Sequence, residues 1–248
     1  MSRVAILMPA YNEGARLFST LDALRASTAG KHALHVFLVD DGGSTSIDAG
    51  EIANRVTPDF RCTLMRHPIN MGQGASLETA RLMALFHDGV GAPSGRPAFD
   101  AYVTMDSDGQ HLPENLDAFV AAIAAGAEVA FGNRFAGDSN VPGVRRIILT
   151  AARVFEHAIT GLALADAHNG YRAFNRAALR VVQIEQNRMA HATEIKQRVA
   201  QHHLKFAEVP VSIRYSGETL QKGQSSLGAL QIIRDLLYGY FFSNERRH

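Results

Sequence analysis

The stretch Tyr102–His111, YVTMDSDGQH, ends an apolar run with two carboxylates, Asp106 and Asp108, that are separated by one small residue. An apolar run such as Tyr102–Met105 is typical of a strand that is buried on both faces. The polar residues that follow would then stand at the carboxyl end of this strand. The carboxylate pair could hold a divalent metal ion, act as an acid and a base, or cap the next helix, and the stretch alone leaves all three open.

Strand and helix patterns alternate around this stretch. Further apolar runs predict five more strands: Val4–Met8, Val36–Val39, Thr63–Met65, Glu128–Phe131 and Phe206–Ile213. Residues 134–190, which lie between the last two of these runs, show little strand pattern. Leucines and alanines at helical spacing lie between the strands of the first half. This β-α-β-α order predicts an α/β fold with a mainly parallel central sheet and helices on both faces.

Four further signals mark helices. The helix after the second strand is expected to start near Ser46, and Pro113 suits the first turn of another. Thr193 could cap a helix that runs to about His203. The amphipathic C-terminal stretch Leu227–Phe242 favours a helix that either packs on the domain or lies peripherally on a membrane surface.

Polar clusters follow three of the predicted strands: Pro9–Glu13, Asp40–Ser44 and Asp106–Asp108. Open parallel sheets bind ligands at the carboxyl ends of their strands. If the three strands are neighbours, the clusters line one crevice. Their recurrence at one edge favours a ligand site over three unrelated turns.

Composition limits the classes of function. The chain has 248 residues, of which 46% are hydrophobic, and a net charge of +1, so no strong field favours nucleic acid. The single cysteine, Cys62, excludes an internal disulfide framework and fits a reducing compartment such as the cytoplasm. The N-terminus lacks a signal-peptide pattern, and no apolar stretch reaches the roughly 20 residues that span a bilayer.

Several motifs together resemble the family 2 glycosyltransferases, in particular their dolichol-phosphate mannosyltransferase-like branch. These motifs are VAILMPAYNE at 4–13, VFLVDDGGSTS at 36–46, NMGQGAS at 70–76, TMDSDGQH at 104–111, FGNRF at 131–135, DAHNGYRAF at 166–174, EVPVSIRY at 208–215 and KGQSS at 222–226. The resemblance implies the GT-A fold, a nucleotide-sugar donor and a divalent metal ion. It favours one domain over residues 1–248, with a nucleotide-binding half at 1–133 and an acceptor-side half at 134–248 that includes the C-terminal helix.

The resemblance also implies roles for individual residues. The first loop would hold base and ribose, Asp41 would read the base edge from an exposed loop, and the whole nucleotide-binding set would be Pro9, Ala10, Tyr11, Glu13, Asp41, Asp106 and Ser107. Asp106 and Asp108 match the DXD motif, and Gln110 could join them on Mg²⁺ or Mn²⁺. Arg134 matches an arginine near the diphosphate or the acceptor, and Asp108, Asp166 and Arg134 form the expected catalytic set.

Two positions depart from the family pattern. The usual DDGS is here DDGGS, with Gly42 and Gly43 both present. Gln73 stands where many relatives have a lysine, which puts any cationic role of this position in doubt.

The chemistry of transfer depends on the acceptor. A divalent ion would stabilise the charge that develops on the leaving diphosphate. The phosphate oxygen of a lipid phosphate is already anionic and needs no base, whereas a sugar hydroxyl needs a proton acceptor. The candidates for that base are Asp166, His168 and Glu194.

We therefore expect a metal-dependent glycosyltransferase that works by single displacement with inversion. Its acceptor would be a polyprenyl phosphate or a growing surface polysaccharide, and its location cytoplasmic or peripheral on the inner face of a membrane. One alternative is a sugar-phosphate nucleotidyltransferase, but that class should carry a glycine-rich basic loop where this chain has PAYNE at 9–13. The other is a non-catalytic nucleotide-sugar-binding protein, which would not need the carboxylate pair.

Overall fold

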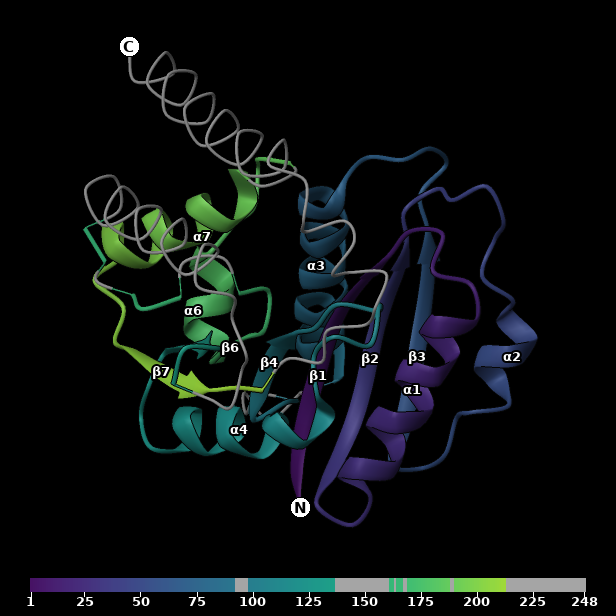
Figure 1. Ribbon diagram of the computed structural model, residues 1–248, viewed down its shortest axis with the longest axis horizontal. Coiled ribbons are helices and arrows are strands. Elements are labelled where there is room, and N and C mark those ends of the chain that lie inside the picture. Colours follow the sequence, from purple (N-terminus) through teal and green to yellow (C-terminus); the bar gives the residue numbers. More distant parts are fainter. Residues whose placement is uncertain (92–97, 137–160, 163, 167–168, 188–189, 213–248) are drawn as a thin grey trace.

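The computed structural model describes residues 1–91, 98–136, 161–162, 164–166, 169–187 and 190–212. Within these residues the chain forms a seven-stranded sheet with the strand order β3-β2-β1-β4-β6-β5-β7 (Figure 1). The strands are β1 (Ser2–Ala10), β2 (His32–Asp40), β3 (Phe60–Arg66), β4 (Ala101–Thr104), β5 (Val129–Asn133), β6 (Arg172–Phe174) and β7 (Phe206–Pro210). The second half of the chain thus adds β6 and β7 to the sheet begun by the first half.

The sheet is mainly parallel, as predicted. Strands β3, β2, β1 and β4 pair in parallel, and so do β5 and β7. β6 runs antiparallel to both of its neighbours, β4 and β5. The expectation of little strand pattern in residues 134–190 was wrong at β6, because this buried strand has three residues and begins with the charged Arg172.

Helices connect the strands: α1 (Ala15–Thr28), α2 (Ala49–Ala53), α3 (Gln73–Gly91), the 3₁₀ turn η1 (Pro113–Asn115), α4 (Leu116–Ala124), α6 (Arg176–Val181) and α7 (Ala190–Gln201). Pro113 opens the first turn as predicted. The predicted start near Ser46 was three residues early, because Asp48 caps α2 by accepting hydrogen bonds from the N–H groups of Gly50 and Glu51. Thr193 is not a cap, since α7 begins at Ala190.

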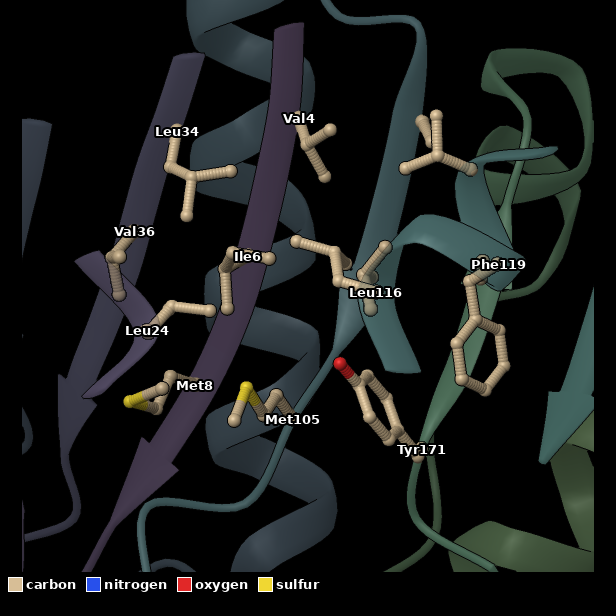
Figure 2. Packing of buried hydrophobic residues seen from close by; sticks show 14 of the residues in the cluster. Val4, Ile6, Met8, Leu24, Leu34, Val36, Met105, Leu116, Phe119 and Tyr171 are labelled. Carbon is tan, nitrogen blue, oxygen red and sulfur yellow. The ribbon is translucent and has the colours of Figure 1, made fainter. Parts of the chain in front are cut away.

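The two faces of the sheet carry separate hydrophobic clusters. In β1, Val4, Ile6 and Met8 point to the face covered by α1 and α4, where Leu24, Leu116 and Phe119 pack against the sheet (Figure 2). The alternate residues Ala5 and Leu7 belong to the cluster with α3, α6 and α7. This alternation confirms helices on both faces and explains why β1 is apolar at every position from Val4 to Met8.

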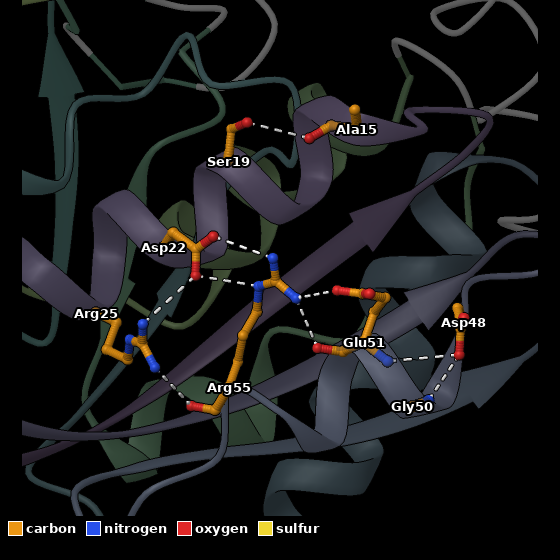
Figure 3. Close-up of polar contacts among 8 residues, drawn as sticks. All are labelled: Ala15, Ser19, Asp22, Arg25, Asp48, Gly50, Glu51 and Arg55. Atoms are coloured by element: carbon orange, nitrogen blue, oxygen red, sulfur yellow. Dashed lines mark hydrogen bonds and ion pairs between the residues drawn. The ribbon is translucent and has the colours of Figure 1, made fainter.

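Polar contacts join the helices of the first two strand connections, α1 and α2 (Figure 3). Arg55 Nε lies 3.0 Å from Asp22 Oδ1 of α1, and Arg55 NH1 lies 2.7 Å from Glu51 Oε2 of α2. The same guanidinium lies 4.8 Å from the centre of the Phe18 ring. Arg55 therefore tethers the short helix α2 to α1.

Other predictions concern single features. Cys62 lies in β3, and burial raises the pKa of its thiol to about 12, as expected of a packing residue rather than a nucleophile. Among the residues that the structure describes, no helix is both long enough and apolar enough to cross a membrane. The predicted C-terminal helix Leu227–Phe242 lies outside the described residues, so the single domain over 1–248 stays a prediction.

Candidate active site

The three polar clusters lie at one edge of the sheet, because β2, β1 and β4 are parallel neighbours. Two side chains join the loops that follow these strands. Ser107 Oγ donates a hydrogen bond of 2.8 Å to the carbonyl oxygen of Pro9, and Asn12 Oδ1 accepts one of 2.8 Å from the N–H of Ser44. The predicted neighbourhood of the clusters is therefore confirmed, and the loops form one connected surface.

The predicted nucleotide-binding residues of the first loop differ in what they present. Pro9 and Ala10 end β1 and are buried; the Pro9 carbonyl oxygen accepts the bond from Ser107, and the Ala10 carbonyl oxygen accepts one of 2.9 Å from the N–H of Asp41. Tyr11 is 49% exposed. Glu13 lies 3.3 Å from Arg16 Nε at the start of α1. Of these, Tyr11 offers the largest exposed side-chain surface.

Asp40 shapes the second loop. Its Oδ1 accepts a hydrogen bond of 3.3 Å from the N–H of Gly43, its Oδ2 accepts one of 3.1 Å from the N–H of Ile47, and Arg66 NH1 lies 2.5 Å from the same Oδ2. These contacts occupy both oxygens. Asp40 therefore has the loop-forming role that its position in a glycine-rich turn favours.

Asp41 is buried, at 3% exposed, so the expectation of an exposed loop was wrong. Its Oδ1 accepts hydrogen bonds from His67 Nδ1 at 2.8 Å and the N–H of Met71 at 3.0 Å, and its Oδ2 accepts one from the N–H of Gly72 at 2.8 Å. Burial by itself raises the pKa of Asp41, but the bonds from His67, Met71 and Gly72 together hold it below its ordinary value. Asp41 thus anchors the 67–72 loop.

Close packing explains the unusual double glycine. Gly42 has a φ of +67°, and a Cβ at this position would overlap the main chain of Ile69. A Cβ on Gly43 would overlap Asn12 Oδ1, the atom that binds Ser44. The two glycines therefore let the second loop fit between the first loop and residues 67–72.

The DXD carboxylates lie on the tight turn after β4. Asp106 Oδ1 accepts a hydrogen bond of 3.0 Å from Gln73 Nε2, and its side chain is 32% exposed. Asp108 Oδ1 accepts one of 3.0 Å from the N–H of Gln110, and its Oδ2 has no hydrogen-bond partner among the described residues. Asp106 is thus partly exposed, and Asp108 has one oxygen without a hydrogen-bond partner among the described residues. Two such carboxylates suit a hard cation, which prefers oxygen ligands.

The turn after β4 offers too few protein ligands to enclose a metal ion. In the described part of the chain, no group of three or more histidine, cysteine, aspartate or glutamate side chains is placed to hold an ion. Two carboxylates and the amide of Gln110 would leave coordination positions for phosphate oxygens. This donor set fits a Mg²⁺ or Mn²⁺ ion that is shared with a diphosphate, rather than one that is fully enclosed by protein.

His111 contacts the turn that carries Asp106 and Asp108. Its ring stacks on Tyr171 with centroids 4.9 Å apart, and its Nδ1 accepts a hydrogen bond of 3.1 Å from the N–H of Asp106. Burial lowers the pKa of His111; the negative charges of Asp106 and Asp108 oppose this shift, and the positive charges of Arg134 and Arg172 add to it. A neutral ring with its proton on Nε2 satisfies both contacts, which agrees with a packing role for His111.

Arg134 and Asp166 meet beside this turn. Arg134 Nε lies 2.6 Å from Asp166 Oδ2, and the same oxygen accepts hydrogen bonds from the N–H of Arg134 at 3.1 Å and from Asn169 Nδ2 at 3.4 Å. The Asp166 side chain is 1% exposed. Asp166 is therefore enclosed by protein donors, a surrounding that suits the holding of Arg134 better than proton abstraction from a bulky acceptor.

The other candidates for a base lie elsewhere. Glu194 is in α7, and its Oε2 accepts hydrogen bonds from the N–H groups of Glu185 at 2.9 Å and Gln186 at 2.8 Å. Burial raises the pKa of Glu194, although these two bonds act against the rise. His168 lies outside the described residues.

The sequence patterns assigned no role to three residues that the structure places beside the predicted site residues: Asn12, Gln73 and His67. Asn12 lies within a cluster that the sequence marked, and its φ of +56° is a signal of a tight turn that only coordinates reveal. Gln73 was noted as a departure from the family pattern, but its contact with Asp106 spans 33 positions of sequence.

The sequence is similar to proteins of a known family. The family model described as Glycosyl transferase family 2 matches residues 5–182. Polyprenol monophosphomannose synthase from Mycolicibacterium smegmatis is 27% identical over 218 residues, which cover 85% of this chain and 77% of that protein. Undecaprenyl-phosphate mannosyltransferase from Micrococcus luteus is 28% identical over 229 residues, which cover 89% of this chain and 88% of that protein.

A solved structure supports the fold. Glucosyl-3-phosphoglycerate synthase from Mycobacterium tuberculosis, in complex with Mn²⁺, UDP and phosphoglyceric acid, superposes with a TM-score of 0.65. The match covers 96% of this chain and 78% of that one at 15% sequence identity. The predicted GT-A fold is confirmed.

The sheet, the strand-end loops and these matches define a nucleotide-sugar-dependent transferase. The chain belongs to glycosyl transferase family 2, and the prediction of a glycosyltransferase is confirmed. The two alternatives, a sugar-phosphate nucleotidyltransferase and a non-catalytic binding protein, have no support among the matches.

Proposed function

We propose that this glycosyltransferase moves one sugar from a nucleoside diphosphate to a polyprenyl phosphate, with a divalent metal ion and with inversion at the anomeric carbon. The observation that carries the proposal is the enclosed ion pair of Asp166 with Arg134. An acceptor that is already anionic needs no proton acceptor, so Asp166, one of the three candidate bases, can hold an arginine instead.

The relatives support the same class of acceptor. The printed names of the Mycolicibacterium and Micrococcus proteins refer to polyprenol and undecaprenyl phosphate, and a further relative from Pyrococcus furiosus is a dolichol-phosphate mannosyltransferase that is 24% identical over 242 residues. The acceptor of this chain is inferred from them by analogy. A surface polysaccharide, the other acceptor considered, has no such support.

The roles of the residues follow from their positions. The loops at Tyr11 and Asp41 would bind the nucleoside, and Asp106, Asp108 and Gln110 would hold Mg²⁺ or Mn²⁺ on the diphosphate. The ion would supply Lewis-acid stabilisation of the charge on the leaving group. Arg134, fixed by Asp166, would place a guanidinium near the diphosphate or the acceptor phosphate, which its donor fork fits.

Inversion follows if the acceptor oxygen attacks the anomeric carbon in one step, opposite the leaving diphosphate. The lipid acceptor would bring the protein to a membrane surface for each turnover.

The test offers the purified protein a panel of UDP- and GDP-sugars with Mn²⁺ and two acceptors, undecaprenyl phosphate and a soluble oligosaccharide. We expect a radiolabelled sugar to enter the lipid fraction, and NMR of the product to show the anomeric configuration opposite to that of the donor. Transfer to the oligosaccharide alone, or retention of configuration, would overturn the proposal. A matched reaction with undecaprenol, which lacks the phosphate, should give no product.

A further inference from the structure

Residues Ile184–Asn187, here called the 184–187 segment, lie between α6 and α7 in the chain and contact the start of α3. We infer that Glu194 is a positioning residue for the Asp106 carboxylate, and that it acts through the 184–187 segment and Gln73. The inference rests on the proposed function in one respect, namely that Asp106 binds the metal ion. It adds to that function a series of contacts, here called the route, through which a residue of α7 affects the affinity for the metal ion.

The first link is between Glu194 and the segment. One oxygen of Glu194, Oε2, accepts hydrogen bonds from the N–H groups of both Glu185 and Gln186, at 2.9 Å and 2.8 Å. Glu194 itself is 6% exposed. The preceding N–H, of Ile184, donates a bond of 3.0 Å to Glu78 Oε2 of α3. Three consecutive N–H groups are therefore fixed by two carboxylates, so the segment has a defined position although it is not part of a helix or strand.

The second link joins the segment to the first turn of α3. Asn187 Oδ1 accepts a hydrogen bond of 2.8 Å from the N–H of Ala75, which is one of the donors that a helix start leaves without an internal partner. A Cβ on Gly74 would overlap the carbonyl oxygen of Gln186. The helix start and the segment are thus in direct main-chain contact, and movement of one requires movement of the other.

The third link is Gln73, the first residue of α3. Its Nε2 donates a hydrogen bond of 3.0 Å to Asp106 Oδ1, which leaves Oδ2 on the side of His111. A neutral amide orients the carboxylate without cancelling its charge. Partners of this kind, in contact with a metal ligand but not with the metal, change metal affinity by roughly 10- to 100-fold when they are removed.

The test measures Mn²⁺ binding directly, by electron paramagnetic resonance of free Mn²⁺ in the presence of UDP or GDP, without donor turnover. Glu194→Ala and Gln73→Leu should each weaken Mn²⁺ binding by about tenfold. Glu194→Gln should stay within about twofold of the wild type, because a single amide oxygen can accept both N–H bonds. Glu185→Gln is the matched control, since its side chain is 60% exposed and pairs only with Arg198 among the described residues.

The double variant tests the route itself. If Glu194 acts through Gln73, Glu194→Ala combined with Gln73→Leu should bind Mn²⁺ no more weakly than Gln73→Leu alone, because residues in one network are not additive. Should Glu194→Ala fail to fold, Asn187→Ala replaces it, since Asn187 is exposed and its loss breaks the same route at the second link.

Three outcomes are decisive. Unchanged Mn²⁺ binding in folded Glu194→Ala or Asn187→Ala, or effects that multiply in the double variant, would overturn the inference while the metal site stands. A wild type that binds no Mn²⁺ with either nucleotide would overturn both the inference and the metal-dependent function. Weakened binding in the single variants, rescue by Glu194→Gln and no further loss in the double variant would support it.

Discussion

Arg134 Nε and Asp166 Oδ2 lie 2.6 Å apart, and the Asp166 side chain is 1% exposed. Removing one partner of a buried ion pair leaves an uncompensated charge and costs roughly 3–5 kcal/mol. The pair therefore gives the charge of Asp166 a structural role, because this charge holds Arg134 in place.

Asp166→Asn separates these two roles. We expect kcat to fall by less than the roughly 10²–10⁴-fold that the loss of a general base causes, because the amide oxygen still accepts from the Arg134 main chain. The midpoint of thermal unfolding should fall, because the bonds to a charged group contribute roughly 1.5–3 kcal/mol each. Steady-state kinetics with undecaprenyl phosphate and a thermal melt measure both effects.

The control for Asp166→Asn is Asp22→Asn, which breaks a pair with Arg55 whose aspartate is 45% exposed. A surface pair of this kind contributes roughly 0–1 kcal/mol. A loss of kcat of about 10²-fold or more in Asp166→Asn, with an unaltered melt, would identify Asp166 as the base instead.

Asp41→Asn should destabilise the fold as well as weaken nucleotide binding. An amide offers one acceptor oxygen where the carboxylate offers two, so one of the donors from His67, Met71 and Gly72 loses its partner. The expected loss is roughly 1–3 kcal/mol in the free energy of unfolding. Denaturant titrations of the two proteins measure it.

The effect of Asp41 depends on pH in a definite direction. Because the pKa of Asp41 is lower in the folded protein, its charged form contributes stability above the ordinary value of 3.8, and this contribution disappears as pH falls below that value through the folded one. The difference between wild type and Asp41→Asn should therefore be full at neutral pH and shrink in acid. A difference that grows on acidification would contradict this assignment.

His35 gives the fold a second pH dependence. Burial, together with the charges of His87 and Arg61, lowers the pKa of His35 from 6.5 to about 4. The unfolded chain then binds a proton that the folded chain does not, so stability should fall as pH decreases from 6.5 to about 4. His35→Phe, which keeps a ring to stack on Phe37, should flatten the unfolding curve in this range, whereas a change of the exposed His202 to glutamine should not. A slope in His35→Phe as steep as that of the wild type would contradict the assignment.

The fold was largely predictable because its buried strands are continuous apolar runs. Val4–Met8 and Val36–Val39 cannot form an exposed helix or loop, and their alternation with periodic helices implies a parallel sheet. β6 was missed because three residues carry no periodicity, and because Arg172 is charged although it is buried at 2% exposed. Tertiary contacts, rather than local preference, make this segment a strand.

The positions of the site loops were predictable for a different reason. Parallel strand ends share one edge of the sheet, so Asp41 and Asp106 could be expected at the same edge. The detailed partners were not predictable: the bonds of Asp41 to the 67–72 loop and of Asp106 to Gln73 join residues about 30 positions apart. Such contacts depend on how loops pack, which neither composition nor spacing encodes.

The most direct test of the account measures sugar transfer by the wild type and by Asp108→Asn, each with Mn²⁺ and after treatment with EDTA. Asp108→Asn keeps the shape of the turn but removes the charge that makes its oxygen a strong ligand for a hard cation. The account predicts that the variant folds as the wild type does and loses most of its transfer rate, that EDTA abolishes transfer by the wild type, and that added Mn²⁺ or Mg²⁺ restores it. Full transfer in EDTA, or a fully active Asp108→Asn enzyme, would contradict the metal site at Asp106 and Asp108.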